Sequence, residues 1–158
     1  MSIWRHLRAI GLLPGMVTLV VPAVIVYRTG AVNIGWGLSS PLSWLPPLLG
    51  GVLIALGVLL MYKTIYLFAT VGEGTLAPWD PTQKLVVRGI YRYVRNPMII
   101  GVLSVLLGEA VFLGSLPVLV WFLIFFAVNA TYIPLLEERG LAGRFGDDYL
   151  VYERNVPR

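Results

Sequence analysis

The chain has 158 residues, of which 58% are hydrophobic and only 13% are charged, and its mean hydropathy is +0.81. A water-soluble domain of this composition would lack the polar surface to cover itself, so much of the chain is expected to lie in lipid. The absence of cysteine excludes disulfides and cysteine-based metal sites. The net charge is +4, and the basic residues lie beside apolar segments, where they more often set membrane orientation than bind nucleic acid.

Four apolar segments are predicted to be membrane helices, because a helix needs about 20 apolar residues to cross a bilayer. The first two run from Ile10 to Tyr27 and from Trp44 to about Ala69. The other two, Met98 to Leu113 and Leu116 to Leu136, are separated only by a Gly-Ser pair, which predicts a tight helical hairpin. The third segment is short for a full crossing. The predicted fold is therefore one all-α integral membrane domain over residues 1–158, with about four transmembrane helices and a C-terminal hairpin.

Basic residues predict which ends of these helices face the cytoplasm. Ten of the twelve lysines and arginines lie before the first span, between the second and third, or after the fourth. They are Arg5, Arg8, Lys84, Arg88, Arg92, Arg95, Arg139, Arg144, Arg154 and Arg158. Arg28 alone lies on the opposite side, and Lys63 lies within a span. Because positive charge is retained on the cytoplasmic side, both termini, the loop 71–97 and the tail 137–158 are predicted to be cytoplasmic.

The loop between the second and third spans reads VGEGTLAPWDPTQKLVVRGIYRYVRNP. Two glycines and two prolines in its first half (Gly72, Gly74, Pro78 and Pro81) interrupt any continuous helix. Val86 and Val87 followed by Gly89 predict a short extended piece with a turn. Irregular backbone at membrane depth is tolerated only where it is buried in protein or lines a cavity. Such a loop, with four positive charges nearby, suits a polar and partly anionic ligand.

The second half of this loop and the C-terminal tail carry motifs in a specific order. They are Arg88-Gly89-Ile90-Tyr91-Arg92-Tyr93-Val94-Arg95-Asn96-Pro97-Met98, Glu137-Glu138, Phe145-Gly146-Asp147-Asp148-Tyr149 with Tyr152, and Val156-Pro157-Arg158. Together they resemble the isoprenylcysteine carboxyl methyltransferase and phospholipid methyltransferase superfamily. Those membrane enzymes carry G-x-Y-x-x-x-R-H/N-P-x-Y-x-G before a helical hairpin, then E-E, F-G-x-x-Y-x-x-Y and V-P-R. The resemblance covers about Gly72 to Arg158, and the joint order and spacing are specific although each motif alone is weak.

The resemblance implies a site for S-adenosyl-L-methionine between the cytoplasmic loop and the helix end that bears the paired glutamates. By position, Lys84 to Val87 would contact the nucleoside, with Tyr91 in support. Asn96 to Ile99 would contact the amino acid end, and Glu137 would accept hydrogen bonds from amino or ribose groups. The implied cofactor-binding residues are Lys84, Leu85, Val86, Val87, Tyr91, Arg95, Asn96, Pro97, Met98, Ile99, Gly101, Glu137 and Glu138. No metal site is expected, and no catalytic base is assigned.

The residue types agree with this implication. A sulfonium cofactor needs a carboxylate for its ammonium group, donors for its carboxylate and an apolar slot for adenine. Glu137, Asn96 with neighbouring Arg95, and the valine and leucine residues of the loop provide these. An acidic pair at the C-terminal end of a helix opposes the helix dipole, a cost that a cationic ligand would offset. Glu138 leaves the helix about 100° from Glu137 and is expected to pair with Arg139 or Arg144.

Departures from the superfamily pattern bear on the methyl acceptor. Asn96 stands where carboxyl methyltransferases have His, and it matches the N-P-M variant that resembles phosphatidylethanolamine N-methyltransferases. Ile99 replaces a Tyr that would help to orient the cofactor. Ile133 stands where prenylcysteine enzymes have an Arg for the substrate carboxylate. The predicted reaction is therefore methyl transfer to a phospholipid amine or another lipophilic O or N nucleophile, rather than to a prenylcysteine carboxylate.

Several intramembrane polar residues have a structural and a functional interpretation. Lys63 is expected to extend its ammonium group toward the interface, whereas Glu109 could face a cavity or mark where the third helix surfaces. Asn129 and Tyr132 could line an acceptor pocket, but hydrogen bonding between helices is the favoured interpretation.

Two other functions use the same scaffold. Sterol reductases share a similar C-terminal half and bind NADPH there, so a membrane reductase is one alternative. A non-catalytic membrane subunit that has lost activity is the other.

Overall fold

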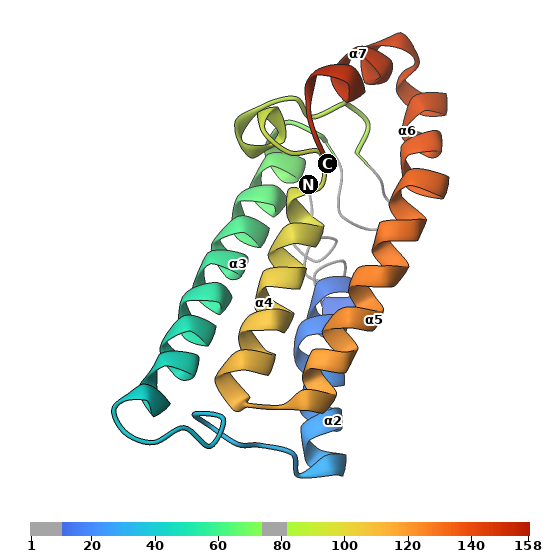
Figure 1. Cartoon of the computed structure of the whole chain (residues 1–158). Coiled ribbons are helices and arrows are strands. Elements are labelled where there is room, and N and C mark those ends of the chain that lie inside the picture. Colours follow the sequence, from blue (N-terminus) through green and yellow to red (C-terminus); the bar gives the residue numbers. More distant parts are fainter. Residues whose placement is uncertain (1–10, 74–81) are drawn as a thin grey trace.

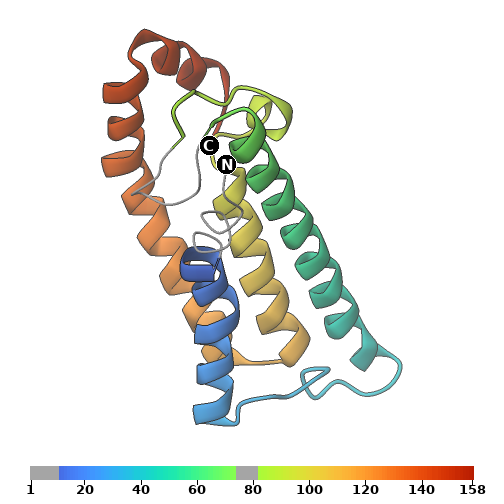
Figure 2. The same cartoon turned by 180° about the vertical axis from the view of Figure 1, so that it is seen from behind.

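The computed structural model of the protein describes residues 11–73 and 82–158, and every regular element within these ranges is a helix. Helices α2, α3, α4 and α5 lie side by side, and the C-terminal segment with α7 covers one end of the bundle (Figures 1 and 2). The all-helical fold predicted from the sequence is confirmed for this part of the chain. Arg5, Arg8 and the loop residues Gly74, Pro78 and Pro81 lie outside the described ranges.

Two helices are long and apolar enough to cross a membrane. Helix α3 (Leu45–Thr70) has 26 residues, which at 1.5 Å per residue gives about 39 Å and exceeds a hydrocarbon core of about 30 Å. The second such helix is continuous from Leu116 to Phe145. Only 11% of the most apolar window of each helix is buried. These side chains are therefore exposed in the manner of a lipid-facing surface, not buried in a protein core.

The second long helix extends beyond its predicted end at Leu136. It comprises α5 (Leu116–Tyr132), the π-helical segment η4 (Ile133–Glu137) and α6 (Glu138–Phe145). Pro134 explains the local change of helix type, because proline has no N–H to donate to the preceding turn. The predicted tail thus begins inside a continuous helix. It turns only at Gly146, where φ is +57°, before α7 (Asp147–Asn155).

Two shorter apolar helices complete the bundle. The N-terminal one consists of the π-helical η1 (Gly11–Val20) and α2 (Val21–Thr29), and the other is α4 (Pro97–Leu113). Trp121 Nε1 donates a hydrogen bond of 3.2 Å to the Val17 carbonyl and so ties α5 to η1. Each is shorter than the two long helices, so a crossing by either remains a prediction.

The predicted hairpin between α4 and α5 is present. Gly114 ends α4 with φ of +62°, and a Cβ there would lie 1.9 Å from the Asn33 carbonyl oxygen, so only glycine fits. The segment that links α2 to η2 (Leu42–Trp44) packs on this end, because Asn33 N–H donates to the Leu113 carbonyl at 2.8 Å. Trp36 Nε1 likewise donates to the Val111 carbonyl at 2.9 Å.

Glycines allow α3 and α4 to pack backbone against backbone. A Cβ on Gly50 would lie 2.6 Å from the Gly108 carbonyl oxygen, and a Cβ on Gly57 would lie 2.7 Å from that of Gly101. Small residues at such contacts are the usual means of close helix packing in membranes. The contact between Gly57 and Gly101 fixes the start of α4 against α3, and with it the end of the loop before α4.

Candidate functional site

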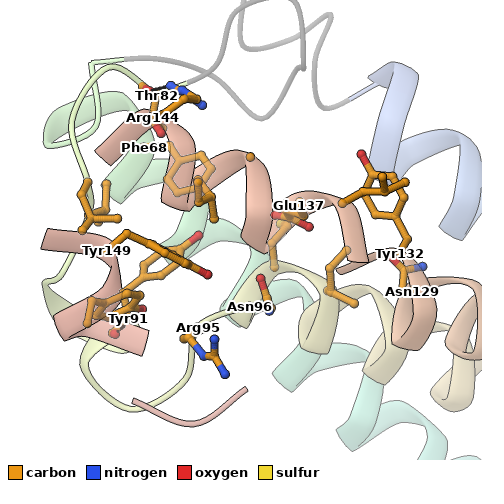
Figure 3. Close-up of a pocket in the computed structure, with 18 of the residues that line it drawn as sticks. Phe68, Thr82, Tyr91, Arg95, Asn96, Asn129, Tyr132, Glu137, Arg144 and Tyr149 are labelled. Atoms are coloured by element: carbon orange, nitrogen blue, oxygen red, sulfur yellow. Dashed lines mark hydrogen bonds between the residues drawn. The ribbon is translucent and has the colours of Figure 1, made fainter. Parts of the chain in front are cut away.

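A cavity of about 560 Å³ lies between the α5–α6 helix, the loop before α4 and the N-terminal helix (Figure 3). Its volume falls within the range of about 300 to 1,000 Å³ for small-molecule sites. The lining residues are Pro14, Val17, Phe68, Thr82, Leu85, Val86, Tyr91, Arg95, Asn96, Met98, Ile99, Val102, Phe125, Asn129, Tyr132, Leu136, Glu137, Gly140, Leu141, Arg144, Phe145, Tyr149 and Tyr152. The cavity thus joins the loop end of the bundle to the apolar helices.

The structure brings eight of the thirteen residues predicted for the cofactor into this one cavity. They are Leu85, Val86, Tyr91, Arg95, Asn96, Met98, Ile99 and Glu137. Asn96 and Glu137 come from segments separated by the whole α4–α5 hairpin, yet both border the same space in Figure 3.

The other five predicted residues do not line the cavity. Gly101 faces α3, where a Cβ would lie 2.7 Å from Met61 Cγ, and the fully buried Pro97 begins the helix. Lys84 forms an exposed ion pair with Glu73. The Val87 side chain is 41% exposed and is not part of the lining. The fifth residue, Glu138, belongs to an ion-pair network.

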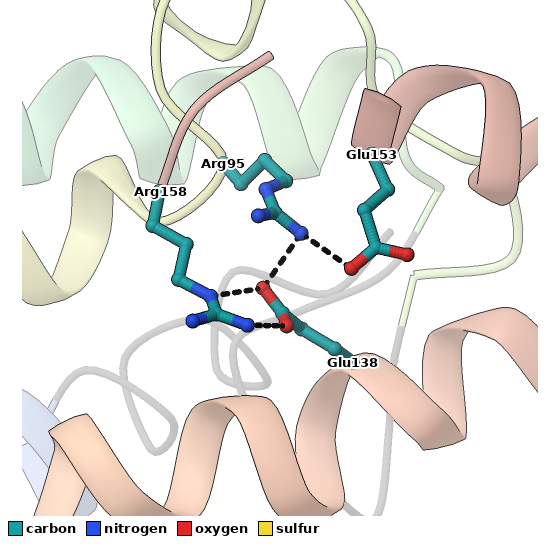
Figure 4. A network of polar contacts seen from close by, with 4 residues as sticks. All are labelled: Arg95, Glu138, Glu153 and Arg158. Carbon is teal, nitrogen blue, oxygen red and sulfur yellow. Dashed lines mark hydrogen bonds and ion pairs between the residues drawn. The ribbon is translucent and has the colours of Figure 1, made fainter. Parts of the chain in front are cut away.

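Glu138 has different partners from those expected. Neither Arg139 nor Arg144 pairs with it among the contacts of the described chain; instead, Arg158 binds both carboxylate oxygens, at 3.0 and 2.7 Å (Figure 4). Arg95 Nη1 lies 2.8 Å from Glu138 Oε1 and also donates to Glu153 at 2.9 Å. The network therefore balances two carboxylates with two guanidinium groups and fastens the C-terminal segment to the loop.

This network limits what Arg95 can offer to a ligand. Its side chain is only 10% exposed, and Nη1 is shared by two carboxylates. The Nε atom is buried and has no hydrogen-bond partner in the described structure. Its backbone N–H donates to the Pro157 carbonyl at 2.9 Å, which adds a further link to the tail. Arg95 therefore holds the wall of the cavity together and supplies positive charge at its edge.

Glu137 differs from Glu138 in that no ion-pair or hydrogen-bond partner for its side chain occurs within the described ranges. It is the only carboxylate among the described residues that line the cavity. A partly buried carboxylate without a partner is costly in a low-dielectric site. A cationic or hydrogen-bond-donating ligand would remove that cost.

Tyr91 forms part of the wall near Glu137 and is held by two contacts. Its ring stacks on Phe68 with a centroid distance of 5.5 Å, and its carbonyl accepts a hydrogen bond of 2.7 Å from Tyr152 Oη. Burial raises the pKa of the Tyr91 phenol far above its usual value of 10, and Tyr152 and Glu137 raise this pKa further. The hydroxyl group is therefore neutral at physiological pH and can donate a hydrogen bond.

The membrane end of the cavity is apolar except for two side chains. Val17, Val102 and Phe125 line it, together with Asn129 and Tyr132. The hydrogen bond between helices that was considered for Asn129 is not the one formed, because Asn129 Nδ2 donates to the Phe125 carbonyl one turn earlier in its own helix, at 2.8 Å. Among the hydrogen bonds of the described residues, none involves the side-chain oxygen of Asn129, which lines the cavity.

Comparison with known protein families shows to which family the chain belongs. The sequence model of the phospholipid methyltransferase family matches residues 46–148, which include α3, the loop, the hairpin and α6. The chain belongs to the phospholipid methyltransferase family. No match was found among curated proteins or among solved structures. The superfamily resemblance predicted from the motifs is confirmed, and membership indicates a membrane methyltransferase that acts on lipid-like substrates and uses a methyl donor.

Several lining residues of this phospholipid methyltransferase family member were not predicted as site residues. Phe68 precedes the recognised motifs, and nothing in the sequence distinguishes it from other apolar residues of α3. Tyr149 and Tyr152 belong to the F-G-x-x-Y-x-x-Y motif, which was recognised without a role for each ring. Both are buried and pack Val156 and α7 onto Phe145 and its neighbours. Arg144 closes the cavity rim by donating to the Thr82 carbonyl.

Proposed function

We propose that this protein transfers a methyl group from S-adenosyl-L-methionine to a lipophilic acceptor within the membrane. The observation that carries the proposal is that the two ends of the cavity differ in polarity. Its loop end holds Asn96 and the unpartnered Glu137, and its other end is apolar and lies among the membrane helices. A polar cofactor and a lipid-like acceptor could therefore meet in one space.

The polar end of the cavity suits S-adenosyl-L-methionine. This cofactor supplies an electrophilic methyl carbon bonded to a positively charged sulfur. Glu137 would accept hydrogen bonds from its ammonium or ribose groups, and Asn96 would donate to its carboxylate. Leu85, Val86 and the stacked Tyr91–Phe68 pair offer apolar surface for the adenine ring.

The apolar end suits the acceptor. We propose that the acceptor is a phospholipid amine or another small lipid-like O or N nucleophile, which reaches the cavity sideways from the bilayer between the membrane helices. Asn129 and Tyr132 would orient its polar group, and Val17, Val102 and Phe125 would contact its hydrocarbon part. Ile133, where prenylcysteine enzymes have an Arg, provides no charge for a prenylcysteine carboxylate.

Catalysis in such a site depends on positioning and on exclusion of water, because the methyl carbon is already activated. An amine acceptor must lose a proton before it attacks. Neither Glu138 nor Glu109 lines the cavity. Glu138 is moreover neutralised by arginines. Glu137 is the one carboxylate among the described lining residues and is assigned to the cofactor, so no residue is proposed as the base.

The decisive experiment measures transfer of labelled methyl from S-adenosyl-L-methionine into a total lipid extract by the purified protein in nanodiscs. We expect a labelled lipid product, whose chromatographic class identifies the acceptor. Calorimetric titrations with S-adenosylhomocysteine and with NADPH accompany it. Tight NADPH binding without a response to S-adenosylhomocysteine would establish a reductase instead. No binding of either ligand, together with no transfer, would establish a non-catalytic subunit.

A further inference from the structure

A second groove lies on the outer side of α3, away from the large cavity. It has a volume of about 400 Å³ and lies between α3 and η3 (Gly89–Arg92). Its lining residues are Tyr62, Lys63, Tyr66, Leu67, Gly89, Ile90, Arg92 and Tyr93. None of them lines the large cavity. We propose that this groove binds the headgroup phosphate of an anionic phospholipid from the leaflet that surrounds this end of the bundle.

Two cations line the groove. Lys63 and Arg92 are both exposed, and neither has an ion-pair partner among residues 11–73 and 82–158. Lys63 lies seven residues before the end of α3, so its Cα is about 10 Å below that end. A charge at this depth is costly unless it reaches the interface or meets a counter-ion. A lipid phosphate held between Lys63 and Arg92 would satisfy both side chains.

Three tyrosines surround these cations. Tyr62, Tyr66 and Tyr93 are 65%, 58% and 74% exposed. Tyrosine is enriched at membrane interfaces because its ring is apolar and its hydroxyl group is polar. The hydroxyl groups add neutral donors to the two charged ones, so the groove is rich in donors and has no carboxylate in its described lining.

The position of Arg92 beside α3 is fixed by packing. Gly89 has φ of +59°, and a Cβ there would lie 3.1 Å from Leu67 Cδ1, so the turn lies directly on α3. The stacking of Tyr91 on Phe68 anchors the same short helix to α3 from within the protein. The backbone that forms the groove is therefore held in place by the packing of η3 on α3.

The surface next to the groove favours a lipid over a free phosphate ion. Leu59, Leu56 and Val52 precede Lys63 by four, seven and eleven residues, a spacing that places them on the same face of the helix. They are 48%, 57% and 48% exposed. They form an apolar track from the groove along α3, along which the acyl chains of a bound lipid can lie.

Native mass spectrometry of the full chain in detergent micelles tests this proposal. The probes are phosphatidylglycerol, phosphatidylcholine with the same acyl chains, and glycerol 3-phosphate, all added without any methyl donor. We expect preferential binding of phosphatidylglycerol that is about tenfold weaker in the double variant Lys63→Gln/Arg92→Gln, given that each cation contributes to anionic lipid binding. Phosphatidylcholine binding should be the same in both proteins.

The matched control is Arg88→Gln/Arg139→Gln, which removes the same charge from exposed residues outside both sites. It should retain phosphatidylglycerol binding. Equal weakening in both double variants would mean diffuse attraction and overturn the proposal, as would unchanged binding in Lys63→Gln/Arg92→Gln. Binding of glycerol 3-phosphate as strong as that of the lipid would show a phosphate site instead. Thermal unfolding midpoints verify that the variants fold, and none of these outcomes depends on methyl transfer.

Discussion

Glu137 and Glu138 are consecutive in one helix, and their side chains therefore leave it about 100° apart. That angle directs Glu137 into the cavity and Glu138 into a cluster with Arg95 and Arg158. Arg95 and Arg158 neutralise the Glu138 carboxylate. The Glu137 carboxylate, in the neighbouring cavity, has no such cation among the described residues. Glu138 is thus a structural residue, and Glu137 is the residue available to a ligand.

Replacing Glu137 tests whether this glutamate, and not Glu138, is available to a ligand. We expect Glu137→Gln to weaken S-adenosylhomocysteine binding by about 10- to 100-fold, as is typical for loss of a charge-assisted hydrogen bond. The same change should leave the thermal unfolding midpoint equal or higher, because it removes an unpartnered buried charge. Calorimetric titration and thermal unfolding of one preparation measure both effects.

The control for this prediction is Asp148→Asn, which removes the same charge from an exposed residue of α7 outside the cavity. It should bind S-adenosylhomocysteine as the unaltered protein does. If Glu137→Gln also binds normally, Glu137 is not a cofactor ligand.

The ion-pair cluster predicts a coupled effect on stability. Glu138→Gln should lower the unfolding midpoint, because it leaves two arginines facing one remaining carboxylate, Glu153. Arg158→Gln should also lower it, but should have little further effect when Glu138 is already replaced. Thermal unfolding of the two single variants and the double variant forms the cycle. Arg154→Gln, an exposed change in α7, serves as the control, and additive losses would contradict the pairing.

Sequence reasoning predicted the cavity-lining residues Asn96 and Glu137 more readily than the residues that support the cavity wall. Asn96 and Glu137 belong to motifs whose order is visible in the chain, whereas the partners of Glu138 are distant in sequence and meet it only after the tail folds back. Arg139 and Arg144 seemed natural partners because they are near in sequence. The α6 helix instead directs Arg144 to the Thr82 carbonyl and over the Phe145 ring.

At the scale of elements, hydropathy predicted the bounds of the four apolar helices within a few residues, except at the end of the last one. The predicted end at Leu136 followed the loss of apolar character at the glutamates. The helix continues to Phe145 because Leu141, Ala142 and Phe145 keep an apolar side that packs against Tyr149 and Tyr152 of α7. Hydropathy did not predict which helices contact each other. Gly57 at the contact with α4 and Gly51, which makes no such contact, have the same hydropathy.

Gly57 allows a direct test of the α3–α4 contact. We expect Gly57→Ala to destabilise the protein by about 1 to 3 kcal/mol, the usual range for overpacking. Its Cβ would lie 2.7 Å from the Gly101 carbonyl oxygen and 2.9 Å from the Val105 nitrogen, both backbone atoms that cannot move alone. Thermal or denaturant unfolding in micelles gives the loss.

Gly51 is the matched control in the same helix, because a Cβ there would meet nothing within 4 Å. Gly51→Ala should cause no loss of stability. Equal losses in the two variants would show that helix propensity, and not contact with α4, determines the effect.

At the scale of the whole molecule, most of the described lysines and arginines lie at one end of the bundle. The segment after α2 and the α4–α5 hairpin share the other end through the Asn33–Leu113 hydrogen bond. Arg28 is the only described lysine or arginine near that end, whereas the loop before α4 and the tail carry the rest, with Lys63 within α3. Because positive charge is retained in the cytoplasm, we predict from this separation four crossings with the polar end of the cavity facing the cytoplasm.

The absence of cysteine from the sequence makes this topology directly measurable. Single cysteines at Ser39 and Leu116 lie in exposed positions at the hairpin end, and one at Asp148 lies exposed at the tail end. We expect a membrane-impermeant maleimide to label the Ser39→Cys and Leu116→Cys proteins in intact cells, and Asp148→Cys only after permeabilisation. Val58→Cys, on the exposed apolar side of α3, should resist labelling in both conditions.

The joint pattern of these labels decides between arrangements that single sites cannot separate. Labelling of Asp148→Cys alone in intact cells would show the reversed orientation, with the polar end of the cavity and the Lys63–Arg92 groove at the outer leaflet. Labelling of Ser39→Cys and Asp148→Cys on one side of the membrane, with Leu116→Cys on the other, would mean that the short helices do not cross and that α3 and the α5–α6 helix alone do. Only the predicted pattern gives the polar end of the cavity access to a cytoplasmic cofactor while the apolar end remains within the bilayer, since both ends belong to one continuous space.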